Sequence, residues 1–222
     1  MILLDNLPKL YEIALSHERV LDVGGWYRPF NLATHVVDIQ DFNSRQNWHA
    51  LDPEHEERFS NDTWCQIDAC NDPWPFPEDY FDFSICSHTL EDLPDPVSVC
   101  EQLARVSKAG YIEVPSILRE LYVKDRWCWL PSLFRQPLEI GFPHHHWLCE
   151  ISDNQIFFTP KNTSLIQSTN SYLTRYSVGR KLSQKESGIC LWWEKTFHYK
   201  ENSSPTAAEI IELKEKAATT KS

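Results

Sequence analysis

Val20-Leu21-Asp22-Val23-Gly24-Gly25 is the stretch that decides the fold of this chain, together with Val36-Val37-Asp38 further on. The first run is typical of a buried strand that ends in a glycine turn, and the second of a strand that ends in a carboxylate. Such a unit can hold an adenosine-containing cofactor, because glycine lets the backbone approach the ligand and the carboxylate accepts hydrogen bonds from ribose hydroxyls. By itself a glycine pair is more often only a tight turn, so the prediction of cofactor binding depends on other residues.

The composition limits the class of protein. The 222 residues are 41% hydrophobic and 24% charged, which is typical of one globular domain with a substantial core. The formal net charge of −11 argues against nucleic acid or an anionic membrane as the main partner. We find no apolar run of about 18 residues and no basic region of a signal peptide. Because the seven cysteines form no C-x-x-C pair, we expect a reduced, cytoplasmic protein without a membrane contact.

Alternating strands and helices are predicted over the first half of the chain. Apolar residues at helical spacing predict helices at residues 5–16 and from Asp95 onward, and a further helix is predicted over residues 46–61. The predicted strands cover residues 20–23, 35–39, 64–69, 81–87 and 111–114. Short apolar strands separated by helical or crossover segments indicate a parallel sheet with helices on its faces.

The pattern changes in the second half of the chain. Residues 147–151 and 155–160 predict a hairpin that turns at Ser152-Asp153-Asn154. Residues 189–199 alternate well enough to predict one more strand. A capping-box pattern predicts a closing helix over residues 204–218.

The most specific part of the sequence runs from Asp68 to Pro96 and reads DACNDPWPFPEDYFDFSICSHTLEDLPDP. Together with the glycine turn, it resembles the compact bacterial members of the class I S-adenosylmethionine-dependent methyltransferases, and the resemblance covers residues 19–116. It implies S-adenosyl-L-methionine as the cofactor. It also implies an α/β fold with a Rossmann-like, mostly parallel seven-stranded sheet, helices on both faces and a C-terminal antiparallel hairpin, which the strands from Trp147 onward could supply.

The resemblance also implies the residues of the site, which lie near the ends of four predicted strands. They are Asp22, Gly24 and Gly25 for the methionine part of the cofactor, Asp38 for the ribose, Asp68 and Ala69 for the adenine, and Ser87 and His88 close to the sulfonium and the acceptor. Open α/β sheets bind ligands beyond the carboxyl ends of their strands, which agrees with these positions. Two alternatives stay open, because Asp38 could be only a strand-end cap and Asp68 could start a turn before Pro73.

His88 is the candidate for a catalytic base. Its unperturbed pKa of about 6.5 would let it take a proton from an acceptor hydroxyl or amine. Methyl transfer needs mainly the alignment of acceptor, methyl group and sulfonium, so the histidine could equally serve the structure.

Two features depart from the family pattern. Trp26 and Arg28 stand where the second and third glycines of the turn commonly fall. Only 12 residues separate Gly25 from Asp38, so we expect the first crossover helix to be short or replaced by a loop built on Pro29. The bulky tryptophan could stack over the cofactor or crowd it.

Three consecutive histidines, His144-His145-His146, invite a metal site, with Cys149 nearby. On a strand, His144 and His146 would share one face, so that at most two histidines converge, whereas a closed zinc site needs about four ligands. We therefore predict no metal site and favour a loop that faces the substrate. Residues 119–142 combine arginines with aromatic side chains, and they form either a lid over the acceptor or a satellite core.

We therefore expect a single domain over residues 1–222. Its parts are an N-terminal helix at 1–18, a cofactor-binding core at 19–116, a lid-like insertion at 117–146, closing strands at 147–200 and the helix at 204–218. The expected function is methyl transfer from S-adenosyl-L-methionine to a small-molecule or glycan-type acceptor, without nucleic acid. The alternative is a methyltransferase fold that has lost catalysis and serves as a scaffold. An NAD(P)-dependent oxidoreductase is disfavoured, because Tyr27-Arg28-Pro29 does not supply a pyrophosphate-binding glycine pattern.

Overall fold

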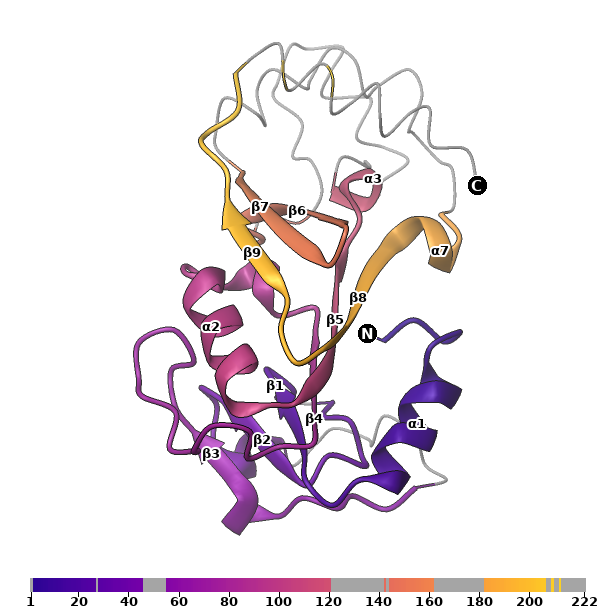
Figure 1. Cartoon of the computed structure of the whole chain (residues 1–222), viewed down its shortest axis with the longest axis vertical. Coiled ribbons are helices and arrows are strands. Elements are labelled where there is room, and N and C mark those ends of the chain that lie inside the picture. The colour runs from indigo at the N-terminus through magenta and orange to yellow at the C-terminus, as the bar shows by residue number, and fades with distance from the viewer. Residues whose placement is uncertain are drawn as a thin grey trace.

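The computed structural model describes residues 2–26, 28–45, 55–120, 142, 144–161, 182–206, 209 and 212 (Figure 1). The helices and strands are, in chain order, α1 (Leu7–Ser16), β1 (Val20–Val23), β2 (His35–Asp38), η1 (Phe42–Arg45), η2 (Asn61–Thr63), β3 (Trp64–Gln66), β4 (Phe83–Ser87), η3 (Leu90–Asp92), α2 (Pro96–Val106), β5 (Ala109–Pro115), α3 (Ile117–Glu120), β6 (Trp147–Ser152), β7 (Gln155–Pro160), α7 (Gln184–Ser187), β8 (Gly188–Glu194) and β9 (His198–Glu201). The elements labelled η are 3-10 helices.

The main sheet has six strands in the order β3-β2-β1-β4-β5-β8. The first five strands in this order run parallel, and β8 pairs antiparallel with β5. The predicted Rossmann-like, mostly parallel sheet is therefore confirmed. The five predicted strands of the first half are all present, although β3 ends at Gln66 rather than at residue 69.

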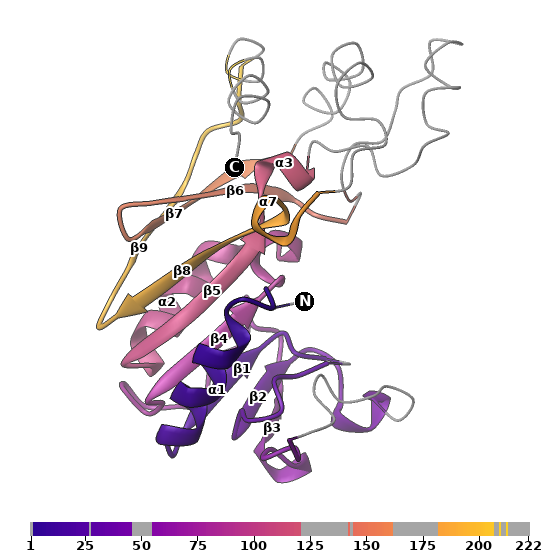
Figure 2. The ribbon, with the colours of Figure 1, turned by 90° about the vertical axis from the view of Figure 1, so that its right-hand side faces the viewer.

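Helices cover both faces of this sheet (Figure 2). Strand side chains alternate between the two faces, and each face carries its own apolar core. Leu21 and Val23 of β1 pack in the core that also contains Leu103 of α2. Val20 of the same strand packs in the other core, together with Leu10 of α1. The near-continuous apolar runs of the parallel strands thus result from burial on both sides.

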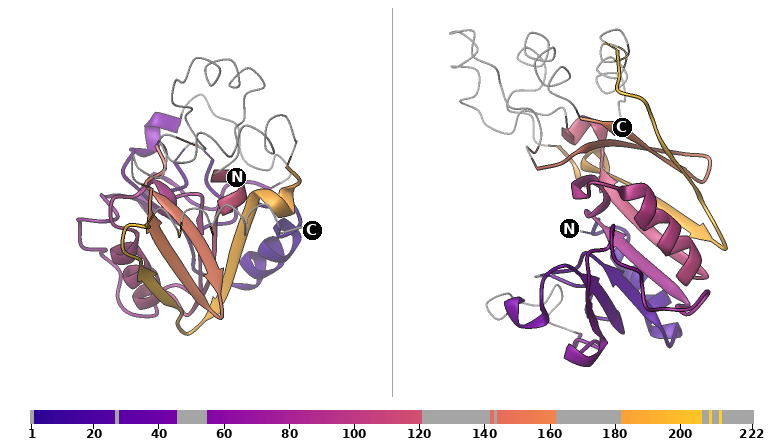
Figure 3. Two further views of the ribbon diagram at one scale, coloured as in Figure 1. Left: turned by 90° about the horizontal axis from the view of Figure 1, so that it is seen from above. Right: turned by 90° about the vertical axis from the view of Figure 1, so that its left-hand side faces the viewer.

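Helix α2 begins as the sequence predicts. Asp95 is its N-cap, and its Oδ1 accepts a hydrogen bond from Ser98 N at 3.0 Å. Pro96 occupies the first helical position, where a missing N–H costs nothing. One face of the helix is buried, including Val99 and Leu103, and lies across the main sheet (Figure 3).

A second, three-stranded sheet, in the order β6-β7-β9, lies beside α2 (Figure 1). The predicted hairpin is present, since β6 and β7 pair antiparallel around Asp153 and Asn154. The expectation that it would complete a seven-stranded sheet is wrong, because the hairpin pairs with β9 and the main sheet ends at β8. The strand predicted over residues 189–199 is present as β8 up to Glu194, but its continuation as one strand to residue 199 is wrong. Lys195 adopts φ 65° and ends β8, so that the chain turns away to form β9.

Other predictions concern segments that connect these strands. The first crossover contains no helix in its described residues, 24–26 and 28–34, as the short spacing predicts. The helix predicted over residues 46–61 is wrong for residues 55–60, and its remainder up to residue 54 lies outside the described residues. Most of the lid-like insertion lies outside them as well. Among the residues that the structure describes, no helix is long and apolar enough to cross a membrane.

The closing helix is described only at its beginning. Thr206 N and its Oγ1 both donate to Glu209 Oε2 at 2.7 Å, which are the bonds that a capping box requires. Residues 209 and 212 are helical, and the rest of the predicted 204–218 helix lies outside the described residues.

Candidate active site at the carboxyl ends of the strands

The carboxyl ends of β2, β1 and β4 lie side by side, because β1 pairs with β2 on one edge and with β4 on the other. The chain continues from β1 to β2, whereas β4 is reached only later, so the loops that follow β1 and β4 diverge. Ligands of open α/β sheets bind in the crevice that this divergence creates. Of the predicted site residues, Asp22 lies inside β1 and all others lie at or just after the strand ends.

Asp22 is buried and serves the loop that follows its own strand. Its Oδ2 accepts a hydrogen bond from Phe30 N at 2.7 Å. Burial raises the pKa of Asp22 to about 7, with the Phe30 N–H acting against this shift and the nearby Asp38 adding to it. A Cβ atom on Gly25 would lie 2.7 Å from the same oxygen, so the carboxyl group fills the space beside this glycine. Asp22 therefore fixes the position of the loop after β1 at Phe30.

Gly24 forms the turn itself. Its φ of 75° is strained for any residue with a side chain, and its N–H donates to Val37 O at 2.8 Å. A Cβ atom on Gly24 would lie 2.3 Å from both Cγ2 and Oγ1 of Thr89. The absent side chain thus makes room for Thr89 from the loop after β4, which in turn donates to Val23 O at 3.2 Å. The sequence did not indicate Thr89, because it contacts the backbone at Val23 and Gly24, and such contacts leave no side-chain pattern.

Asp38 lies at the end of β2 and accepts hydrogen bonds from two backbone groups. Trp26 N donates to its Oδ2 and Gln40 N to its Oδ1, each at 2.8 Å. Burial raises the pKa of Asp38, and these backbone bonds oppose the shift. Each oxygen of an ionised carboxylate has a second acceptor position, so hydrogen bonds to ribose hydroxyls remain available. Trp26 reaches across from the turn to η1, where its Nε1 donates to Ser44 Oγ at 3.0 Å.

Asp68 and Ala69 belong to a loop that is held together by its own side chains. Asp68 Oδ1 accepts from Cys70 N and its Oδ2 from Asn71 Nδ2, each at 2.9 Å. The Asn71 side chain is the main cause of the lowered pKa of Asp68. Ala69 O accepts from the indole of the buried Trp74 at 3.0 Å. The alternative that Asp68 starts a turn before Pro73 therefore matches its contacts.

Ser87 is the last residue of β4, and its hydroxyl is in an unusual position. The Oγ atom is buried and has no hydrogen-bond partner among the described residues. A buried polar atom without a partner destabilises a protein by about 1–3 kcal/mol, so such an atom at the crevice indicates a group that a ligand can satisfy. Ser87 thus combines the predicted position with an available hydrogen-bonding group.

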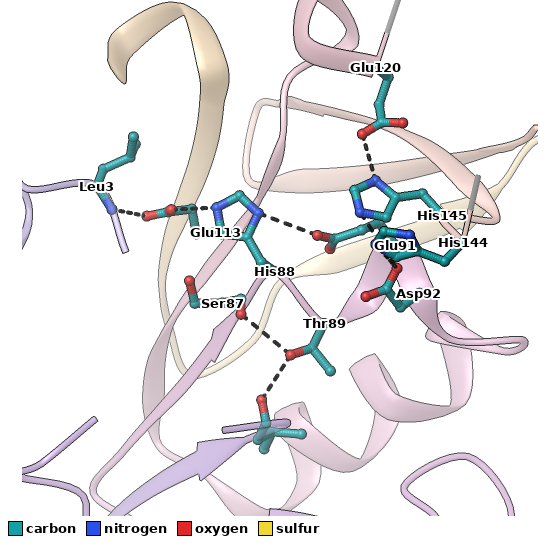
Figure 4. A network of polar contacts seen from close by, with 11 residues as sticks. Leu3, Ser87, His88, Thr89, Glu91, Asp92, Glu113, Glu120, His144 and His145 are labelled. Carbon is teal, nitrogen blue, oxygen red and sulfur yellow. Dashed lines mark hydrogen bonds and ion pairs between the residues drawn. The ribbon is translucent and has the colours of Figure 1, made fainter. Parts of the chain in front are cut away.

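His88 lies between two buried carboxylates (Figure 4). Its Nε2 is 2.9 Å from Glu113 Oε1 and its Nδ1 is 3.3 Å from Glu91 Oε1. Burial lowers the pKa of His88, but the hydrogen bonds that its ring donates to Glu113 and Glu91 outweigh this effect and leave the pKa raised. Glu113 also accepts from Leu3 N at 2.9 Å and from the Tyr111 hydroxyl. With both ring nitrogens held by carboxylates, the geometry favours a structural histidine over a base.

The acidic partner of His88 could have been noticed in the sequence. Glu113 interrupts the apolar strand β5 and is fully buried there. A glutamate is almost never fully buried without a partner, so a charged residue in the middle of such a run indicates a buried polar network. The sequence could not reveal that the partner of Glu113 is His88, which lies 25 residues earlier, directly after the neighbouring strand β4.

These residues fit S-adenosylmethionine. Asp38 is the last residue of β2 and Asp68 lies two residues after the end of β3, and both carboxylates can accept hydrogen bonds from an adenosine group. The Ser87 hydroxyl is unpaired in the described part of the chain. At the glycine turn, Gly24 accommodates Thr89. Gly25 likewise accommodates the Asp22 carboxyl group.

A separate hollow of about 860 Å³ lies at the opposite end of the parallel strands. It is lined by Arg19, which precedes β1, by Asp82, which precedes β4, and by Ala109 at the start of β5. These are the amino ends of the strands, where open α/β sheets do not place their ligands. We therefore assign no site to this hollow.

Comparisons with known proteins agree with the resemblance noted in the sequence. Residues 32–112 match the family model described as a methyltransferase domain. Among solved structures, the chain is similar to the YcgJ protein from Bacillus subtilis, at 20% identity over 50% of this chain and 51% of that chain, with a TM-score of 0.34. It is also similar to an S-adenosylmethionine-dependent methyltransferase from Mesorhizobium loti, at 15% identity over 53% of this chain and 56% of that chain, with a TM-score of 0.36. The chain thus spans about half the length of these two structures. A search of curated proteins found no significant match.

Proposed function

We infer, from the match of residues 32–112 to the methyltransferase-domain family model, that the chain is an S-adenosylmethionine-dependent methyltransferase. The observation that carries this inference is the Ser87 hydroxyl, which is buried and unpaired in the described structure at the carboxyl end of β4. Open α/β sheets bind their ligands at this end of the strands. When bound, the cofactor supplies an electrophilic methyl group on a sulfonium.

In this proposal the residues at the strand ends bind and orient the ligand. Asp38 accepts hydrogen bonds from the ribose hydroxyls while it keeps its bonds to Trp26 N and Gln40 N. Asp68 faces the adenine amino group, and Ser87 donates to or accepts from the amino-acid part. His88 acts as a positioning residue, because its two carboxylate contacts fix the loop after β4. Methyl transfer then depends on alignment rather than on a protein base.

The acceptor in this proposal is a small molecule or a sugar-bearing metabolite. The net charge of −11 supports this class over nucleic acid, because a chain of this charge repels a phosphate backbone. We expect its site next to Ser87, at the carboxyl end of β4.

A catalytically inactive scaffold is the second candidate. It is favoured by the contacts of the glycine turn, since Gly24 accommodates Thr89 and Asp38 is bonded to Trp26 N. In a scaffold, Gly24 and Asp38 would serve only to stabilise the turn after β1. The two candidates differ in whether the chain binds the cofactor at all.

Calorimetry with S-adenosylmethionine and S-adenosylhomocysteine separates them. Ser87→Ala removes an unpaired hydroxyl, so we expect unchanged or slightly raised stability and, from the loss of one hydrogen bond of about 1 kcal/mol, about fivefold weaker binding. Ser107→Ala is the matched control, because Ser107 Oγ is also buried and unpaired among the described residues but lies at the end of α2.

Two outcomes would contradict the proposal in different ways. No heat of binding at about millimolar cofactor, which corresponds to about 4 kcal/mol of binding free energy, would favour the scaffold. Equal affinity of the wild type, Ser87→Ala and Ser107→Ala proteins would remove the role of the Ser87 hydroxyl while leaving cofactor binding intact.

A further inference from the structure

Three potential metal ligands converge beside the crevice, on its His88 side (Figure 4). They are Asp92 at the end of η3 and the pair His144 and His145 just before β6. His145 Nε2 lies 3.6 Å from Asp92 Oδ1, and His144 Nε2 lies 4.0 Å from the same oxygen. All three ligand atoms lie within 4.8 Å of one another. The alternation expected for residues 144–146 does not apply, because β6 begins only at Trp147.

The orientation of His145 is fixed by a buried carboxylate. Its Nδ1 lies 2.6 Å from Glu120 Oε1, and Lys161 Nζ lies 2.8 Å from Glu120 Oε2. Glu120 and Lys161 are only 1% and 2% exposed, respectively. Because Lys161 holds one oxygen of Glu120, the other oxygen is placed to accept a hydrogen bond from His145 Nδ1.

This arrangement leaves the other nitrogen of His145 directed at Asp92. With Nδ1 donating to Glu120, Nε2 is the ring nitrogen that can act as a metal ligand, and it faces a carboxylate oxygen. At 3.6 Å the two atoms are too far apart for a normal hydrogen bond. A cation between them would satisfy both groups. Histidine ligands of metals commonly donate their second nitrogen to a carboxylate, as His145 does to Glu120.

We propose that Asp92, His144 and His145 bind a divalent transition-metal ion of the zinc type, with Glu120 as the residue that positions His145. Two ligand atoms of a tetrahedral zinc ion with bonds of about 2.1 Å are about 3.4 Å apart, which is close to the separations at Asp92. Two imidazoles and one carboxylate are a donor set that zinc accepts, with a fourth position left for water or a substrate atom.

The site goes beyond the proposed methyl transfer, because it would join two parts of the chain. Asp92 follows directly on Glu91, the partner of His88, and His146 N already donates to Glu91 O at 2.7 Å. An ion at Asp92 would hold η3 against the segment before β6. The loop between Ser87 and η3, which contains His88, would then be fixed at its η3 end.

Titration of the metal-free full chain with zinc ions, followed by calorimetry, tests the proposal. We expect one ion per chain and a loss of affinity of about tenfold or more in Asp92→Asn and in His144→Ala. Both side chains are largely exposed, at 41% and 65%, so these variants should fold normally. His198→Ala is the control, because His198 is exposed on β9, away from the site, and its loss should leave the affinity unchanged.

Cobalt ions provide a second readout that activity cannot supply. Bound at this site, cobalt should give the visible spectrum of nitrogen and oxygen ligation, without the thiolate charge-transfer band that binding at the cysteines would produce. Absence of zinc binding, a thiolate band, or equal affinity in the wild type, Asp92→Asn and His144→Ala would overturn the proposal. Cofactor calorimetry on the metal-free chain is a separate measurement, so a failure of either proposal is recognised independently.

Discussion

Replacing Gly24 by alanine tests how the turn after β1 is built. The φ of 75° is strained for alanine, which costs about 1–2 kcal/mol. The new Cβ atom would lie 2.3 Å from Cγ2 and Oγ1 of Thr89, and relief of such overpacking typically costs about 1–3 kcal/mol. Alanine also reduces the freedom of the unfolded chain, which returns about 0.5–1 kcal/mol.

We therefore expect Gly24→Ala to lower the free energy of unfolding by about 1–4.5 kcal/mol. For a chain of this size, each kcal/mol corresponds to about 2–4 °C in the midpoint of thermal unfolding. Urea unfolding followed by circular dichroism measures the free energy directly, provided the transition is two-state.

Gly188→Ala is the matched control for this change. Gly188 lies in extended backbone at φ −137°, and a Cβ atom there would meet Leu3 Cδ2 at 3.3 Å, at the end of a flexible side chain. We expect a change within about 1 kcal/mol. In a double-mutant cycle, Thr89→Ala should reduce the cost of Gly24→Ala by about 1 kcal/mol, because two of the three close contacts disappear. Equal costs at Gly24 and Gly188, or no coupling to Thr89, would refute the reasoning.

Two further predictions concern buried charges. Because the pKa of His88 is raised in the folded state, its stabilising effect should be complete below about pH 6.5 and decline as the pH rises through the folded pKa. The difference in unfolding free energy between wild type and His88→Asn should thus be larger at about pH 6 than at about pH 9, and a pH-independent difference would contradict this. Lys161→Met should destabilise the protein by about 3–5 kcal/mol in urea unfolding, because it leaves Glu120 buried with less charge compensation. Lys185→Met, at a mostly exposed pair with Asp5, should cost less than about 1 kcal/mol, and similar costs for both lysines would argue against the buried pair.

Local patterns in the sequence determined the parallel core of this protein. The apolar runs that end at Val23, Asp38 and Ser87 predicted their strands, because burial on both faces leaves no polar alternation. Asp95 and Pro96 predicted the start of α2, since a cap and a first-turn proline act within four residues. The positions of the site residues at the strand ends followed from these elements together with the family resemblance.

Contacts between distant residues were decided only by the tertiary structure. Nothing near Gly24 indicates that Thr89 occupies the space of its missing side chain, 65 residues along the chain. The same holds for the second sheet, since strand pairing depends on which edges meet after folding and not on the strands' own sequences. The run of histidines stands out in the sequence, but nothing in the sequence connects His145 with Asp92 or Glu120. The direction in which each of these side chains points arises from its contacts with the others, and these contacts exist only in the folded chain.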